Sequence, residues 1–459
     1  MVVNFIREKL SFLRTKALSL FKRIGSKISW KDDRFKIFFL ALVIYLFSLS
    51  VIRAFHSEDE FSYFYLTYSI VENQSFIIDQ TVAGHHLSNT ENFVYYNGNW
   101  YSKYPPGLPI LAIPFYLIGG FLWQSLGFDG FPLIAMCSIS AFSAALSLVI
   151  IYEFCTLFNF SLVAKRATTI TYGFGTIAWV YAKTFFSHST ATLFILVGLY
   201  FFISMTKDEN TDLVYTKSIL SGTAIGLATL IRYTGFLFVF PLAFYFFRKQ
   251  MSLKKTRLVL FTIPLLMFIL LAGWYNFICF DSPFITGYHL NQLYGNETER
   301  FTTPIYIGLW GLLISPKRGL FIYSPVLIFS IVGVKHLYTE VKEETILLIS
   351  SFVLLLLVYS AWWYWPGGLC YGPRLLHEAI PMFTIPIGKS LDSYKHKRIF
   401  WIVFILLLCF SIYAQFAAVA TDFITTDYPT SFDEIGLIAV SRSLFNGEFD
   451  TVLSHLLKI

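Results

Sequence analysis

The sequence predicts an all-α polytopic membrane protein. Hydrophobic residues make up 56% of its 459 positions and charged residues only 14%, and the mean hydropathy is +0.62. A soluble protein could not cover this much apolar material with so few charges. The apolar residues also form long runs that lack the alternation of a barrel strand. Since backbone groups in lipid must pair within their own segment, these runs are expected to be helices.

About eleven runs are expected to cross the membrane, and most approach the ~20 residues that span ~30 Å of hydrocarbon. Those without Asp, Glu, Lys or Arg are Ile37–Ile52, Phe131–Tyr152, Ala167–Ala182, Thr184–Thr206, Ser218–Ile231, Tyr233–Phe247, Leu258–Phe280, Gly319–Val334, Thr345–Pro373 and Ile399–Thr421. One more, Leu375–Leu391, is shorter and has His377 and Glu378 near its start.

A further apolar run, Tyr104–Phe128, decides the topology. If it crosses the membrane, the basic segments 248–257 and 389–398 face outward; if it does not, they face the cytoplasm, as the positive-inside rule prefers. Its four prolines and its Gly119-Gly120 pair also suit a bent segment. We therefore expect residues 53–130 to form one large outer loop that contains juxtamembrane helices.

The remaining organisation follows from that topology. Residues 1–36 are rich in Lys and Arg, which keeps them in the cytoplasm and accounts for the net charge of +7, so nucleic acid is not an expected partner. Residues 37–420 are expected to form one transmembrane domain in the cell membrane, and residues 421–459 an outer tail. The five cysteines lack metal-ligand spacing. We expect no cofactor, but the carboxylates are able to bind a divalent metal, so a metal is not excluded.

Acidic and basic residues from distant segments meet at the expected outer face. Three adjacent acids, Glu58, Asp59 and Glu60, open the first outer loop. The residues that join them from later segments are Lys103, His188, Arg232, Lys317, Arg318, Tyr371, Arg374 and Glu378. The basic ones lie beside Gly and Pro turns, where guanidinium groups can converge on a phosphate at the bilayer surface. The alternative is that each is a helix-end charge that reaches toward water.

Several short motifs occur in a specific order along this face. They are Asp59-Glu60-Phe61, Tyr101–Pro109, Gly226–Tyr233, Ser315–Gly319, and Gly367-Gly368 followed by Tyr371–Arg374. With these motifs the sequence resembles the GT-C superfamily of polytopic glycosyltransferases, over about residues 37–420. Within it, the sequence is most similar to the branch of protein O-mannosyltransferases and aminoarabinose lipid A transferases.

The resemblance implies a function and a set of roles. It implies transfer of a hexose or pentose from a polyprenyl phosphate to a glycan, lipid or protein acceptor, with inversion, on the extracytoplasmic side. Asp59 matches the catalytic acid of the family, with Glu60 beside it. The implied donor-phosphate ligands are Arg374 as first choice, then Arg232, Lys103, Lys317 and Arg318. Glu58, His188, Tyr371 and Glu378 are further candidate substrate contacts, and which of the three adjacent acids is the base stays open.

The chemistry that follows is a single displacement at the anomeric carbon. Asp59 takes the proton of the acceptor hydroxyl, while fixed Arg and Lys groups stabilise the charge that builds on the departing phosphate. We expect the sugar to hold the acidic and basic groups apart, because direct ion pairing would quench both.

Two other functions compete with this one. An ion-coupled transporter usually carries ionisable groups in mid-membrane and internal repeats, and neither is evident in this sequence. A lipid-linked glycan flippase is harder to exclude. A glycan polymerase or ligase would share the outer basic residues, so the sequence discriminates poorly against it. The acidic start of the first loop favours transfer of a single sugar.

Overall fold

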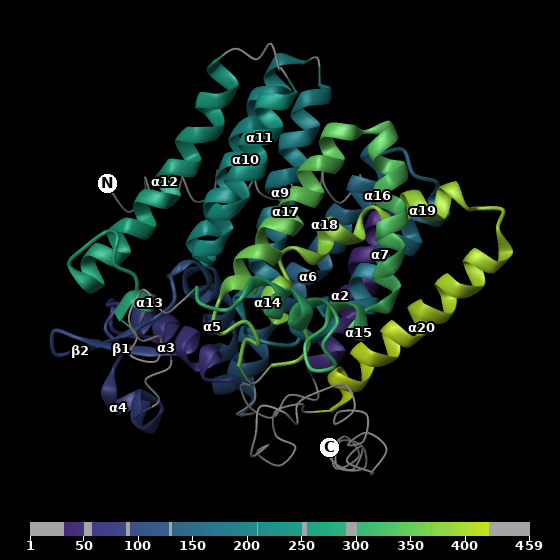
Figure 1. Ribbon diagram of the computed structural model, residues 1–459. Coiled ribbons are helices and arrows are strands. Elements are labelled where there is room, and N and C mark those ends of the chain that lie inside the picture. Colours follow the sequence, from purple (N-terminus) through teal and green to yellow (C-terminus); the bar gives the residue numbers. More distant parts are fainter. Residues whose placement is uncertain are drawn as a thin grey trace, which may run out of the picture.

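The computed structural model describes residues 32–49, 57–88, 92–127, 131–208, 210–249, 255–290, 301–368 and 370–421. Within these ranges the chain is helical apart from loops and one two-stranded hairpin. Figure 1 shows long helices side by side above a layer of short helices, loops and the hairpin. The predicted all-α membrane fold is confirmed. Of the expected basic segment 1–36 and the expected outer tail 421–459, residues 1–31 and 422–459 lie outside the described residues.

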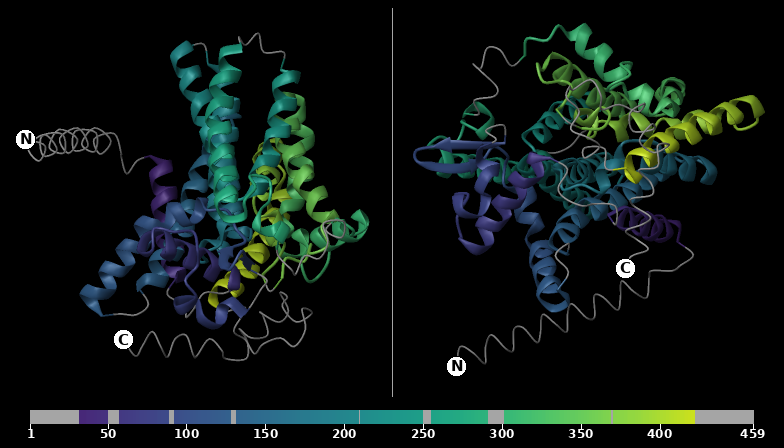
Figure 2. Two further views of the ribbon diagram at one scale, coloured as in Figure 1. Left: turned by 90° about the vertical axis from the view of Figure 1, so that its left-hand side faces the viewer. Right: turned by 90° about the horizontal axis from the view of Figure 1, so that it is seen from below.

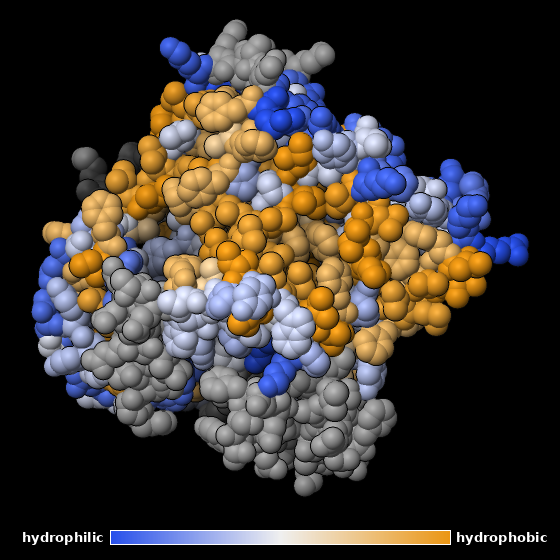
Figure 3. All heavy atoms as spheres, in the orientation of Figure 1, coloured by the Kyte–Doolittle hydropathy of each residue, from blue (hydrophilic) through white to orange (hydrophobic). Residues whose placement is uncertain are grey.

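Seven helices in the described ranges are long and apolar enough to cross a membrane. Six match predicted spans: α6 (Phe131–Leu157), α9 (Ser187–Lys207), α10 (Thr211–Ile231), α12 (Lys255–Phe280), α17 (Lys342–Ala361) and α20 (Arg398–Ala420). The seventh is α5 (Gly107–Leu126), from the run that was expected to stay outside. Apolar side chains cover the middle of the face seen in Figure 3, as they do in a multi-pass membrane protein.

The other predicted spans take a different form. The first is a single helix, α2 (Asp33–Ser48), and each of the other four is divided into shorter helices. The second consists of α7 (Leu162–Gly175) and α8 (Ala178–Ala182), and the third of η3 (Tyr233–Phe238) and α11 (Val239–Arg248). The fourth consists of α15 (Leu320–Tyr323), η6 (Pro325–Leu327) and α16 (Ile328–Glu340), and the fifth of η7 (Arg374–Leu376), α18 (Ile380–Thr384) and α19 (Ile387–Ser393). Pro325, Pro381 and Pro386 stand at the breaks, because proline cannot donate the helical hydrogen bond.

The helices define two ends of the molecule. At the far end, uppermost in Figure 1, α9 meets α10 and α16 meets α17. This end holds the ion pairs Arg34–Glu153, Arg166–Asp33, Arg248–Glu343 and Lys249–Glu344. At the opposite end, called the site end below, α10 and α17 finish and α9 begins.

Both ends of α5 lie at the site end. A Cβ on Gly107 would come within 2.4 Å of the Leu230 carbonyl oxygen, so the start of α5 packs closely against the last turn of α10. The other end, at Leu126, is five positions before Phe131, where α6 begins. Since α6 ends at Leu157, whose carbonyl accepts a hydrogen bond from Lys207 at the far end, its start lies at the site end. Figure 2 shows the two blue helices, α5 and α6, sloping together away from the bundle.

The loop between α2 and α6, which the sequence predicts to be the first outer loop, has its own small architecture beside the bundle. It contains α3 (Glu58–Glu72), α4 (Gln80–Ala83), η2 (Gly84–Ser88), and an antiparallel hairpin of β1 (Phe93–Tyr96) and β2 (Asn99–Ser102). The register pairs Phe93 with Ser102. The hairpin turn is Asn97-Gly98, and both residues have positive φ, as a two-residue turn of this kind requires. Two more short helices, α13 (Gly287–Leu290) and α14 (Ile305–Leu313), complete this layer.

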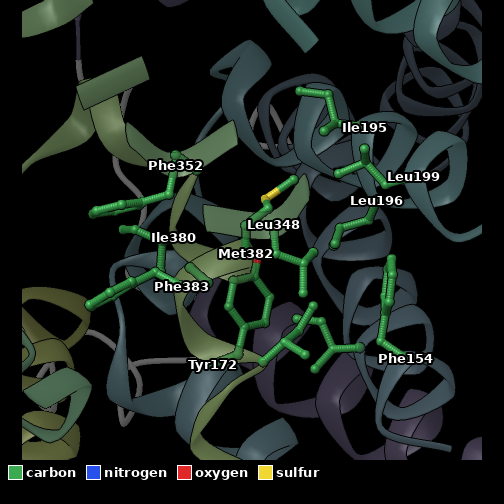
Figure 4. Close-up of a cluster of buried hydrophobic side chains, with 14 of the residues drawn as sticks. Phe154, Tyr172, Ile195, Leu196, Leu199, Leu348, Phe352, Ile380, Met382 and Phe383 are labelled. Carbon is green, nitrogen blue, oxygen red and sulfur yellow. The ribbon is translucent and has the colours of Figure 1, made fainter. Parts of the chain in front are cut away.

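A hydrophobic core lies inside the bundle and carries the site end. Figure 4 shows side chains of α6, α7, α9 and α17 meeting those of α18. Phe352 of α17 stacks on Phe383 of α18, with ring centroids 4.5 Å apart. Because α18 follows closely after residues 374–378, its burial in the core anchors that segment.

Candidate active site

The three adjacent acids at the start of α3 have three different environments. Glu58 lies 3.1 Å from Nδ1 of His86 and is partly exposed. Glu60 is fully buried, and its carboxylate accepts hydrogen bonds from the backbone N–H groups of Ser57 and Phe185. Asp59 points elsewhere, because successive residues of a helix are turned by about 100°. The fold therefore separates these acids, and only Asp59 faces a cluster of basic side chains.

Asp59 forms an ion pair with Arg374. The Arg374 Nη1 donates a hydrogen bond of 2.8 Å to the Asp59 Oδ2, and the two side chains are 12% and 17% exposed. This pair joins the first outer loop to a segment more than 300 positions later. The acidic and basic groups that the sugar was expected to hold apart are in direct contact in this structure. Two partly buried opposite charges at one location pair because each lacks water to solvate it.

The charges around Asp59 keep it ionised. Burial works against its charged form, but the positive charges of Arg374 and Lys103, together with hydrogen bonds from Tyr104 and Arg374, lower the pKa of Asp59 below its ordinary value. A carboxylate that stays charged at neutral pH can accept a proton from a hydroxyl group. Lys103 is itself buried, and its Nζ lies 5.0 Å from the centre of the Tyr104 ring.

Arg374 is presented by a tight turn. Gly372 has a φ of 61°, a conformation that a side chain would strain, and Pro373 and η7 follow. The guanidinium lies 4.9 Å from the centre of the Phe186 ring, which supports it by a cation–π contact. Among the described residues, its Nε is buried without a hydrogen-bond partner. Arg374 therefore has donor capacity that its pair with Asp59 does not use.

A second ion pair lies beside the first. The Arg232 Nε is 2.8 Å from the Glu378 Oε1, and Nδ1 of His188 is 2.8 Å from the same oxygen. The Arg232 Nη1 also donates to the Ser187 hydroxyl, which accepts a second hydrogen bond from the hydroxyl of Tyr63. Since Tyr63 follows Asp59 by one helical turn on α3, this chain of contacts links the two ion pairs.

The remaining sequence-predicted residues have other surroundings. Arg318 is buried and donates hydrogen bonds to the carbonyl oxygens of Pro366, Lys317 and Gly368, so it ties two loops together. The Tyr371 hydroxyl donates to the Ala414 carbonyl of α20. Lys317 is exposed. The structure thus brings Asp59, Lys103, His188, Arg232, Arg374 and Glu378 together, and it gives Arg318 and Tyr371 structural contacts.

Comparison with known proteins identifies the fold. Neither a protein-family model nor a curated protein sequence matches this chain. Its structure is similar to that of ArnT from Cupriavidus metallidurans bound to undecaprenyl phosphate, with a TM-score of 0.51 and 13% identity over 91% of this chain and 73% of that one. ArnT is an aminoarabinose lipid A transferase of the GT-C superfamily. The chain has the GT-C fold.

Two further solved structures are similar to this chain. The apo state of the same ArnT gives a TM-score of 0.51 at 13% identity, over 92% of this chain and 76% of that one. The oligosaccharyltransferase of Archaeoglobus fulgidus, in a complex with Zn and sulfate, gives 0.48 at 14% identity, over 84% and 53%. At this identity the likeness to ArnT establishes the GT-C fold and leaves the activity to be argued from the site.

Sequence reasoning missed part of the site in this GT-C fold. Tyr63, Ser187 and Tyr359 all take part in the network around Arg232. Of these, Tyr63 carried a usable signal, because it lies four positions after Asp59 and shares its helix face. In the described ranges, no group of three His, Cys, Asp or Glu side chains is placed to hold a metal ion.

Proposed function

We propose that the protein is an inverting glycosyltransferase that moves a sugar from a polyprenyl-phosphate donor to an acceptor hydroxyl at the extracytoplasmic membrane face. The observation that carries this proposal is the Asp59–Arg374 pair at the site end of a GT-C fold. A carboxylate that accepts a proton and a guanidinium that binds a phosphate are the two groups that the reaction needs. Their contact across 2.8 Å puts both within reach of one small substrate group.

The reaction is a single displacement. Asp59 accepts the proton of the acceptor hydroxyl as that oxygen forms a bond to the anomeric carbon of the sugar. The bond between this carbon and the donor phosphate oxygen breaks, and the electron pair leaves with the polyprenyl phosphate. Arg374 and Lys103 stabilise the negative charge that builds on this oxygen. One displacement from the opposite face inverts the anomeric centre.

The ion pair is compatible with this chemistry because phosphate and carboxylate compete for the same guanidinium. Arginine binds a phosphate through two parallel hydrogen bonds. When a donor phosphate takes hydrogen bonds from Arg374, Asp59 loses part of its counter-charge and becomes a stronger base. Donor binding would therefore prepare the carboxylate for the acceptor, and the sugar would then lie between the two groups.

The distribution of charge supports an extracytoplasmic site. Basic loops concentrate at the far end, where Arg166, Arg248, Lys249 and Lys389 form ion pairs with neighbouring acids. Under the positive-inside rule that end faces the cytoplasm. The site end then faces outward, where a polyprenyl-linked sugar would meet its acceptor with its lipid tail in the bilayer.

The test is turnover by the purified protein. Wild-type protein in detergent would be offered a panel of polyprenyl-phosphate sugars, and donor consumption and free polyprenyl phosphate would be measured. We expect at least one donor to be cleaved, and an Asp59→Asn variant to bind that donor without cleaving it. Reconstituted vesicles provide the second arm. Movement of labelled lipid across the bilayer with no new glycosidic bond would replace this proposal with a flippase.

A further inference from the structure

Glu378 is a buried acid whose contacts set it apart from the proposed base. Its side chain is 1% exposed, and one oxygen, Oε1, lies 2.8 Å from both Arg232 and His188. The other oxygen, Oε2, is buried without a hydrogen-bond partner among the described residues. A buried carboxylate requires a counter-charge, and Arg232 provides it here.

Arg232 is held on several sides. Its Nη1 contacts the Ser187 hydroxyl at 3.2 Å and Nε2 of His188 at 3.5 Å, and its Nη2 donates to the Tyr359 hydroxyl at 3.4 Å. These partners come from α9 and α17, and Glu378 adds a contact from the segment between η7 and α18. The guanidinium is therefore fixed to the wall of the site by its neighbours.

The contacts of His188 agree with this arrangement. A ring that donates from Nδ1 to the Glu378 carboxylate has an acceptor at Nε2, which is the atom that faces Arg232. The ring is thus hydrogen-bonded to the carboxylate and contacts the guanidinium, and Glu378 touches both other members, His188 by a hydrogen bond and Arg232 by an ion pair. Removal of the carboxylate would release both at once.

The two arginines of the site consequently differ. The positive charge of Arg232 is balanced by Glu378, which among the described residues forms no ion pair with another Arg or Lys. Arg374 shares Asp59 with Lys103, so Asp59, Arg374 and Lys103 together carry one net positive charge. This net positive charge equals in size the single negative charge of a phosphate diester. A second arginine without a counter-ion would make the positive charge of the site larger than the negative charge of the diester.

We propose that Glu378 is a positioning residue that neutralises Arg232 and holds both Arg232 and His188 in place, so that Arg374 is the arginine that binds the donor phosphate. This inference rests on the proposed function and extends it, because it divides two candidate phosphate ligands into one that binds and one that supports. Glu378 touches neither the donor nor the acceptor in this assignment.

The experiment is a double-mutant cycle on phosphate-lipid binding and turnover. Wild type, Glu378→Gln, Arg232→Gln and the double variant would be compared for the Kd of a synthetic short-chain polyprenyl phosphate. Glu378→Gln leaves Arg232 unbalanced, so we expect about tenfold tighter binding and a lower kcat because product leaves slowly. Arg232→Gln leaves Glu378 unbalanced, so binding weakens about tenfold. The double variant removes both charges and returns to within about threefold of wild type.

The double variant decides the outcome. If it binds as weakly as Arg232→Gln, Arg232 is itself a phosphate ligand and the assignment of Glu378 is wrong. Because the double variant leaves no lone buried charge, it is the protein to compare with wild type if either single variant does not fold. Then binding within about threefold supports the proposal, and binding more than about tenfold weaker overturns it.

A matched control removes a similar ion pair elsewhere. Glu344 is 3% exposed and pairs with Lys249 at 2.6 Å, at the far end of the bundle. We expect a Glu344→Gln and Lys249→Gln double variant to keep the wild-type Kd. If the wild type binds no polyprenyl phosphate, the proposed function fails. If the wild type binds it but the double variant binds as weakly as Arg232→Gln, only the role of Glu378 fails.

Discussion

Replacement of Arg374 by glutamine should shift the pH dependence of the reaction. Asp59 must be ionised to accept a proton, so activity is lost as the pH falls through its pKa. Burial raises that pKa, and Arg374 and Lys103 lower it to below its ordinary value. Without Arg374, burial is opposed mainly by Lys103, and the pKa rises. The acid limb of kcat/KM should therefore move to higher pH.

The size of this shift follows from the geometry of the pair. Charges about 4 Å apart interact by about 4 kcal/mol at an effective dielectric constant near 20, and about 1.4 kcal/mol corresponds to one pH unit. Lys103 remains and offsets part of the loss. We therefore expect the acid limb to move up by about 1 to 3 pH units, the range seen for carboxylates beside arginine.

The assay is kcat/KM between pH 3 and pH 9 for wild type, Arg374→Gln and Arg374→Lys. The lysine variant keeps the charge and loses the paired donors, so its acid limb should stay near that of wild type while its donor KM rises. If the glutamine variant is slower at every pH with an unchanged acid limb, Arg374 does not control the ionisation of the base. Asp59 would then not be the group that titrates.

Four further substitutions test the separate roles of the acids and of a buried lysine. Asp59→Asn should reduce turnover about 10² to 10⁴-fold with donor binding retained, whereas Glu58→Gln should stay within a few-fold of wild type; equal losses in both would contradict the choice of base. Glu60→Gln should lower thermal stability in detergent, by about 1–3 kcal/mol, because two backbone N–H groups lose a charged acceptor; full stability with lost activity would instead indicate a chemical role. Lys183→Met should also destabilise the fold, because its buried Nζ donates to the carbonyl oxygens of residues 418, 419 and 421 at the end of α20; an unchanged melting temperature would refute this.

The three adjacent acids illustrate where sequence reasoning stopped. Composition and charge placed Glu58, Asp59 and Glu60 at a membrane boundary, and the resemblance favoured the second. Nothing in their order along the chain distinguishes a proton acceptor from a buried acceptor of backbone hydrogen bonds. The difference arises from helix phase and from what packs on each side, since Phe185 and Arg374 are distant in sequence.

The broken helices illustrate a second limit. Charge-free runs indicated membrane segments correctly, but a run such as Leu375–Leu391 was expected to be one span. The structure divides it into η7, α18 and α19, all buried against other helices. Apolar character reports that a segment avoids water, and it does not distinguish lipid from protein as the surroundings.

Composition, charge distribution and motif order were enough to determine a helical GT-C membrane fold with a charged site at one end. These features depend on solvation of single residues and on local periodicity, which a linear sequence contains. Only the tertiary structure decided which acid pairs with which base. The Asp59–Arg374 and Glu378–Arg232 pairs form because three separate segments converge. Electrostatic interactions between side chains depend on distance in space, whatever their separation along the chain.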